Sequence, residues 1–241
     1  MIELKSLTCK YANEIILENI SAKLNSHITL LGANGSGKST LAKALCKLIE
    51  FTGEILLDGK NICEYTPLQR AKKISYIPTK LEFYDEFLSL EEFVLLGRFP
   101  YKKSFFGYTN EDTAIAQEKM KLLNLSRLRD HSLASLSSGE TNLALIAQAL
   151  TQESSIIIFD EPTANLDPKN AKIIAQHIKN LKQTHQTVLI THDIYLANFI
   201  ENDVLFLKDK KVTYFKNDFF SDENLTALYD VKFSSLKVEY D

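Results

Sequence analysis

At 241 residues, the chain is long enough for one large α/β domain or two small ones. Hydrophobic residues make up 45% and charged residues 24%, and the net charge of −3 gives no reason to expect binding to nucleic acid or to an anionic membrane. No apolar run approaches the length of a membrane span, the N-terminus lacks the features of a signal peptide, and the three cysteines show no C-x-x-C spacing. We therefore expect a cytoplasmic protein without disulfides or a zinc site.

Short β-like runs with little helix between them open the chain, and they predict antiparallel strands that lead into a buried strand. Tyr11 lies in a turn-like stretch between them, where its ring could stack on an adenine. The alternative is that Tyr11 only covers a sheet edge, which most tyrosines in such places do. The predicted strands are Ile2–Thr8, Ile15–Leu17, Ile20–Leu24 and Ile28–Leu31.

The next segment, Gly32–Thr40, has the spacing G-x-x-x-x-G-K-[ST] between an apolar strand and a predicted helix over residues 41–49. Glycines on such a turn let successive N–H groups point at one phosphate, and the helix N-terminus adds partial positive charge. Lys38 would reach the β- and γ-phosphates, and the Ser39 hydroxyl would hold Mg²⁺. The alternative is a glycine-rich turn that only caps a helix. The predicted nucleotide-binding residues are Gly32, Asn34, Gly35, Ser36, Gly37, Lys38, Ser39 and Thr40.

Residues 89–150 differ from the α/β segments on either side of them. Ser89 has the character of a helix N-cap, and helical periodicity recurs over 113–125 and at Leu143–Leu150. Predicted strands lie before this stretch, at residues 53–58 and 74–77, and after it. We therefore expect a mostly helical insert in an α/β core.

Two later strands end in polar residues. The apolar run Ile156–Phe159 is followed by Asp160 and Glu161, and a buried parallel sheet would deliver both carboxylates to a nucleotide site. There Asp160 would orient Mg²⁺ and Glu161 would polarise the attacking water. His192 follows the next apolar run and could contact the γ-phosphate or its water, although a lone histidine is more often structural.

These motifs stand together with Leu136–Glu140, and the combination resembles the ATP-binding subunit of ABC transporters over residues 2 to 235. Their shared order and spacing are far more specific than any single motif. In the terms of that family, the matching segments are Gly32–Thr40 (Walker A), Ile156–Glu161 (Walker B), Leu136–Glu140 (the signature, usually LSGGQ), Ala164–Asp167 (the D-loop), His192 (the switch histidine) and Tyr11 (the adenine-stacking aromatic).

The resemblance implies one ABC-type ATP-binding domain over residues 1–241, with an α/β P-loop NTPase core, an N-terminal antiparallel β subdomain and an inserted α-helical subdomain. It implies ATP and Mg²⁺ as cofactors and a head-to-tail homodimer, in which Ser137 and Gly139 contact the nucleotide of the other subunit. It further implies two transmembrane permease subunits, indirectly a substrate-binding protein, no nucleic acid, and a peripheral location on the inner face of the cell membrane.

A narrower resemblance concerns Leu96–Tyr101 and Glu223–Val231, which look like importers of iron-siderophore, haem or cobalamin type. We therefore expect an ATPase that energises uptake of an iron chelate, such as a siderophore, ferric citrate or haem. Thr79 replaces the glutamine that the family places on Mg²⁺, so its hydroxyl would reach the metal only through water, and Ser138 replaces a signature glycine. Two alternatives stay open: a nucleotide-responsive coupling subunit with weak or no hydrolysis, and an ABC ATPase outside transport.

Overall fold

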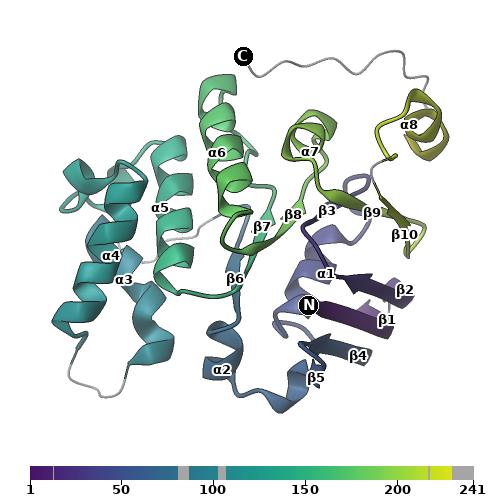
Figure 1. Ribbon diagram of the computed structural model, residues 1–241, viewed down its shortest axis with the longest axis horizontal. Coiled ribbons are helices and arrows are strands. Elements are labelled where there is room, and N and C mark those ends of the chain that lie inside the picture. The colour runs from purple at the N-terminus through teal and green to yellow at the C-terminus, as the bar shows by residue number, and fades with distance from the viewer. Residues whose placement is uncertain (13, 81–86, 103–106, 217, 230–241) are drawn as a thin grey trace.

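The computed structural model describes residues 1–241 except 13, 81–86, 103–106, 217 and 230–241. Figure 1 shows an antiparallel sheet on the right, a larger sheet in the middle, and helices α3, α4 and α5 on the left. This confirms the predicted α/β fold with an N-terminal antiparallel region and inserted helices. Within the described ranges, no helix combines the length and the apolar character that crossing a bilayer requires.

The antiparallel sheet contains β1 (Ile2–Tyr11), β2 (Glu14–Leu24), β4 (Phe51–Leu57) and β5 (Lys60–Asn61), in the order β2-β1-β4-β5. The prediction of separate strands at Ile15–Leu17 and Ile20–Leu24 was wrong, because β2 runs through both. Asn19 has a φ of 49°, and the register of β2 against β1 shifts near it. This β-bulge keeps Leu17 and Ile20 on the same buried face.

The central sheet contains β3 (Ile28–Leu31), β6 (Ile74–Ile77), β7 (Ile156–Asp160), β8 (Gln186–Ile190), β9 (Asp203–Lys208) and β10 (Lys211–Phe215), in the order β10-β9-β3-β8-β7-β6. All pairs are parallel except the β9–β10 hairpin. The continuous apolar runs predicted buried strands, and every residue of β3 and β7 is buried. The carboxyl ends of β3, β7 and β8 therefore open at the same edge of the sheet.

The helices are α1 (Lys38–Leu45), α2 (Pro67–Ala71), α3 (Leu90–Leu95), α4 (Asn110–Leu122), α5 (Ser138–Thr151), α6 (Pro168–Leu181), α7 (Ile194–Ile200) and α8 (Asp222–Tyr229), with 3-10 turns at Ile62–Glu64, Leu96–Tyr101, Ser126–Leu128 and Leu133–Ser135. The prediction that the helix after the glycine-rich loop reaches residue 49 was wrong. Lys47 has a φ of 54°, and Leu48 is 60% exposed. Helix α5 begins at Ser138, earlier than the predicted Leu143, because polar residues form its first turn.

The helices between β6 and β7 are held together by a buried arginine. The Arg98 guanidinium donates to Asp112 at 2.9 Å, to Glu153 at 2.6 Å and to the Thr151 carbonyl oxygen at 3.1 Å. A Cβ at Gly97 would lie 2.4 Å from the Gln148 carbonyl oxygen, so the chain can approach α5 only with glycine there. These contacts give the run Leu96–Tyr101 a structural role. Of the second run used for the narrower resemblance, residues 230 and 231 lie outside the described residues.

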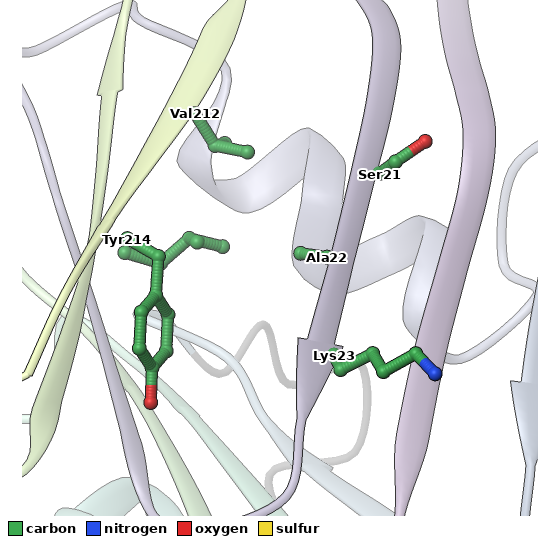
Figure 2. A pocket seen from close by; sticks show the side chains of 6 residues that line it. Ser21, Ala22, Lys23, Val212 and Tyr214 are labelled. Atoms are coloured by element: carbon green, nitrogen blue, oxygen red, sulfur yellow. The ribbon is translucent and has the colours of Figure 1, made fainter.

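The two sheets meet at β2 and β10, where the Glu18 amide donates to the Lys210 carbonyl oxygen at 3.0 Å. Farther along, the strands enclose a cavity of about 280 Å³, and Figure 2 shows Ala22 on one side of it with Val212 and Tyr214 on the other. The Tyr214 hydroxyl donates to Asp203 at 2.5 Å. None of the described residues that line this cavity is a predicted site residue.

Candidate functional site

The glycine-rich loop turns from the end of β3 into α1 with backbone angles that favour glycine. Gly32 has a φ of 154°, and a Cβ there would lie 2.5 Å from the Leu207 carbonyl oxygen. Gly37 has a φ of 106° and precedes the first turn of α1, and no described side chain caps that turn. The free N–H groups of the turn are therefore available to an anion.

A cavity of about 440 Å³ lies beside this loop. It brings together residues that are far apart in the sequence, including the predicted adenine contact and the predicted catalytic carboxylate. The described residues that line it are Tyr11, Ile16, Asn34, Gly35, Gly37, Lys38, Ser39, Thr40 and Glu161.

Lys38 is the buried cation of the cavity. Its side chain is 6% exposed, and its Nζ donates to the carbonyl oxygens of Gly32 at 2.9 Å and Ala33 at 3.1 Å. The Nζ also lies 3.8 Å from Glu161 Oε1. Burial lowers the pKa of Lys38, while Glu161 and Asp160 act in the opposite direction. An anionic ligand would relieve this burial penalty by supplying negative charge.

The carboxylate of Asp160, at the end of β7, has a hydrogen-bond donor at each oxygen. Ser39 Oγ donates to Oδ1 at 3.0 Å, and the Tyr76 hydroxyl donates to Oδ2 at 2.8 Å. Burial, followed by the nearby Asp160 charge, raises the pKa of Tyr76 well above its usual value. The phenol therefore stays a donor, and Asp160, only 2% exposed, is held as an acceptor.

Glu161 turns out of the strand with a φ of 51°. Its Oε1 lies 2.9 Å from His192 Nδ1. Its Oε2 accepts from the Thr191 hydroxyl at 3.2 Å and from the His192 backbone N–H at 3.3 Å. The two predicted catalytic residues, Glu161 and His192, are thus in contact, and a fully buried threonine fixes one of the carboxylate oxygens.

The structure separates other predicted residues from this cluster. Thr79 is exposed and is not among the described residues that line the cavity. Ser137 and Gly139 lie at the start of α5 and do not line it either. Tyr11 does line the cavity, with its side chain 65% exposed, which leaves its ring accessible.

The start of α5 has a closed hydrogen-bond arrangement of its own. The Ser137 N–H donates to Glu140 Oε2 at 3.0 Å and the Glu140 N–H donates to Ser137 Oγ at 3.4 Å, which forms a capping box. Ser137 Oγ also donates to Glu140 Oε2 at 2.7 Å. The hydrogen bonds from Ser137 lower the pKa of Glu140. Gly139 faces the neighbouring helix α6, because a Cβ there would lie 2.8 Å from the side chain of Asn170.

Comparison with known proteins identifies the family to which the chain belongs. The family model for the ABC transporter matches residues 17–164. The chain belongs to the ABC transporter family. A relative from Helicobacter pylori, named "Probable iron chelatin transport ATP-binding protein", is 33% identical over 98% of this chain and 95% of its own length. The petrobactin import ATP-binding protein FpuD of Bacillus anthracis is 30% identical over 88% of this chain and 79% of its own length.

Solved ABC structures agree with the fold. A structure described as "An inward-facing conformation of a putative metal-chelate type ABC transporter" matches with a TM-score of 0.85 at 27% identity over 99% of this chain and 92% of that chain. An ATP-binding cassette in a dimeric post-hydrolysis state with ADP and phosphate matches with a TM-score of 0.76 at 30% identity, over 90% of this chain and 98% of that chain. This chain is thus an ATP-binding ABC subunit and an ATPase.

Sequence reasoning missed three residues that contact the predicted site of this ABC subunit. Tyr76 touches Asp160, Thr191 touches Glu161, and Asn170 packs on Gly139. Tyr76 and Thr191 lie at or next to the ends of strands that neighbour β7, and this position was the available signal. The sequence held no signal for Asn170, because its contact with Gly139 depends on how closely α5 and α6 pack.

Proposed function

We propose that this chain hydrolyses Mg²⁺-ATP to energise an importer, and that the cavity beside the glycine-rich loop is its nucleotide site. The observation that carries this proposal is the meeting of the glycine-rich loop with the two carboxylates after β7: Lys38 lies 3.8 Å from Glu161, and Ser39 donates to Asp160 at 3.0 Å. Ser36 Oγ, in the same loop, is buried without a hydrogen-bond partner among the described residues, and Ser36 is not among the described residues that line the cavity. A phosphate oxygen would satisfy this hydroxyl once the side chain turned toward the cavity.

The residues fit a magnesium–phosphate complex. Ser39 and Asp160 present a hydroxyl and a carboxylate, which are the oxygen ligands that Mg²⁺ takes beside substrate phosphates. When bound, the metal would neutralise charge on the phosphates. We keep Thr79 as an outer contact through water, because its exposed hydroxyl lies outside the cavity lining.

The chain's own groups suit proton transfer from water. Glu161 would accept a proton at its carboxylate, while Thr191 and the His192 N–H hold Oε2 in place. His192, whose side chain is 54% exposed, can turn its ring toward a bound phosphate. Lys38 would exchange its two loop carbonyls for phosphate oxygens, while Tyr11 stacks on the base.

The working unit in this proposal is a homodimer. Ser137 and Gly139 lie outside the cavity of their own subunit, so in this proposal they would contact the nucleotide of a second copy. A related cassette, 30% identical over 88% of this chain and 96% of its own length with a TM-score of 0.76, is dimeric in its structure. Two transmembrane permease subunits would hold this dimer on the inner face of the membrane, and a substrate-binding protein would deliver the cargo.

The cargo class rests on the relatives. Proteins named for iron chelatin transport and for petrobactin import match this chain at 33% and 30% identity. We therefore propose an iron chelate, such as a siderophore, ferric citrate or haem. This part of the proposal is tested by loss of iron-chelate uptake when the gene is deleted.

Phosphate release from ATP by the purified chain tests the enzymatic part. We expect Mg²⁺-dependent activity that rises more than linearly with protein concentration. Glu161→Gln should lower it by about 10²- to 10⁴-fold while ATP still binds. The matched control is Glu201→Gln, because the Glu201 side chain is exposed and its ion-pair partner among the described residues is Lys179, away from the cavity. ATP binding without turnover, with and without permeases, would instead support a coupling subunit.

A further inference from the structure

Within the part of the chain that the structure describes, the carboxylate of Asp160 accepts hydrogen bonds from two different elements. Ser39 reaches Oδ1 from α1, whereas Tyr76 reaches Oδ2 from β6 at 2.8 Å. Ser39 is itself a proposed metal contact. Tyr76 is a residue of the neighbouring strand that has no place in the proposed chemistry so far.

The register of the sheet explains how Tyr76 reaches this carboxylate. Tyr76 lies opposite Ile158 in the parallel pair β6–β7. Because alternate residues of a strand share a face, Ile158 and Asp160 lie on the same face of β7. The Tyr76 side chain is long enough to extend from the position opposite Ile158 to the Asp160 carboxylate. Its ring packs against the hydrophobic cluster under α1, which contains Ile158 and Leu41, so the hydroxyl has a fixed position.

Without the phenol, one oxygen of Asp160 would lose its donor. The outer torsion of an aspartate side chain is broad, so the carboxylate plane is set mainly by what its oxygens contact. Ser39 holds only Oδ1. Thr79, which follows β6 and Pro78, is exposed and does not take the place of Tyr76 as a donor to Oδ2. Among the described residues, the side-chain donors to Asp160 are therefore Ser39 and Tyr76.

We propose that Tyr76 is a positioning residue that sets the orientation of the Asp160 carboxylate for magnesium. This inference rests on the proposed function, because it assigns Asp160 to the metal. The phenol does not bind the metal or the nucleotide. It donates to Oδ2, and this leaves Oδ1 with Ser39 on the side of the glycine-rich loop.

Binding of a non-hydrolysable ATP analogue, measured with excess Mg²⁺ and again with EDTA, tests this inference. The ratio of the two dissociation constants isolates the contribution of the metal. We expect Tyr76→Phe to leave the affinity in EDTA unchanged and to reduce the gain from Mg²⁺ by about tenfold, the usual effect of losing an outer-shell partner. Tyr65→Phe is the matched control, because its hydroxyl donates to the Leu57 carbonyl oxygen at 3.2 Å in the same region.

Each outcome decides between the alternatives. An unchanged ratio in Tyr76→Phe, or an equal loss with and without Mg²⁺, would overturn the positioning role and leave Tyr76 as a structural link between strands. A wild-type protein that gains no affinity from Mg²⁺, and that behaves like Asp160→Asn, would instead overturn the proposed metal site. The affinity in EDTA also reports whether Tyr76→Phe folds.

Discussion

Buried charges occur in two regions of the molecule, and their surroundings differ. Among helices α3–α5, the Arg98 guanidinium is surrounded by two carboxylates and a carbonyl oxygen. In the cavity at the carboxyl ends of the central strands, the partners of Lys38 at hydrogen-bond distance among the described residues are two loop carbonyls, and the carboxylate of Glu161 is 3.8 Å away. The first arrangement is complete within the chain, whereas the second has room for a charged ligand.

The same contrast appears in the backbone and in the hydroxyl groups. Helices α3, α4 and α5 each begin with a capping box, so the first-turn donors have partners. Helix α1 begins without a side-chain cap among the described residues, and Ser36 Oγ has no hydrogen-bond partner among them. The uncapped first turn of α1 and the unpaired hydroxyl of Ser36 both belong to the glycine-rich loop and its helix, where binding is proposed. The comparison thus separates residues that stabilise the fold from residues that await a ligand.

The largest expected effect concerns stability in the helical region. Arg98→Ala should lower the free energy of unfolding by about 3–5 kcal/mol, because it leaves Asp112 buried without its partner. Denaturant unfolding monitored by circular dichroism measures this. Arg127→Ala is the control, since Arg127 is 80% exposed and should change the free energy by less than about 1 kcal/mol. A loss below 1 kcal/mol in Arg98→Ala would contradict the assignment of this region to stability.

The same pair predicts a pH dependence. Burial would raise the pKa of Asp112, but hydrogen bonds from Thr109 and Arg98 outweigh it, so the pKa lies below its ordinary value of 3.8. A lowered folded-state pKa contributes stability above pH 3.8, and this contribution is lost as the pH falls through the folded value. The stability difference between wild type and Arg98→Ala should therefore narrow in acid. Unfolding curves between neutral pH and pH 3 would show it.

The next effect concerns binding in the cavity. Lys38→Met should weaken ATP binding by about 10- to 100-fold, because hydrogen bonds to charged groups contribute about 1.5–3 kcal/mol. Its free energy of unfolding should not fall, because burial disfavours the ammonium and lowers the pKa of Lys38. Equilibrium binding and denaturant unfolding measure the two quantities. Lys43→Met is the control, an exposed residue of the same helix. A Lys38→Met variant that lost stability but kept its affinity for ATP would show that Lys38 stabilises the fold and does not bind the nucleotide.

How far the sequence predicts these regions depends on how local the determinants are. The glycine-rich loop and the carboxylates after β7 are encoded by contiguous residues, and the structure has the predicted strand, turn and helix there. The end of α1 at Leu45 is not encoded so locally, because Leu48 fits the helical pattern and yet is exposed. The contact of Tyr76 with Asp160 depends on the register between two strands, which a single sequence does not reveal.

The smallest expected effect concerns two buried hydroxyl groups, one in the glycine-rich loop and one in β3. Ser36 Oγ in the loop and Thr29 Oγ1 in β3 are both buried without a hydrogen-bond partner among the described residues. A buried hydroxyl without a partner costs about 1–3 kcal/mol, so Ser36→Ala and Thr29→Val should each raise the free energy of unfolding by about 1 kcal/mol. Thermal and denaturant unfolding of both variants check this.

Of these two substitutions, only Ser36→Ala should change the affinity for ATP. Ser36 lies in the loop beside the cavity, so Ser36→Ala should weaken ATP binding by about tenfold, the loss expected for one hydrogen bond to a phosphate. Thr29 lies within β3, where every residue is buried, and Thr29→Val should leave the affinity unchanged. If Ser36→Ala gained stability and kept full affinity, its hydroxyl would be a packing defect like that of Thr29. A gain in stability with a loss of affinity would instead show that this group is left unpaired for the nucleotide.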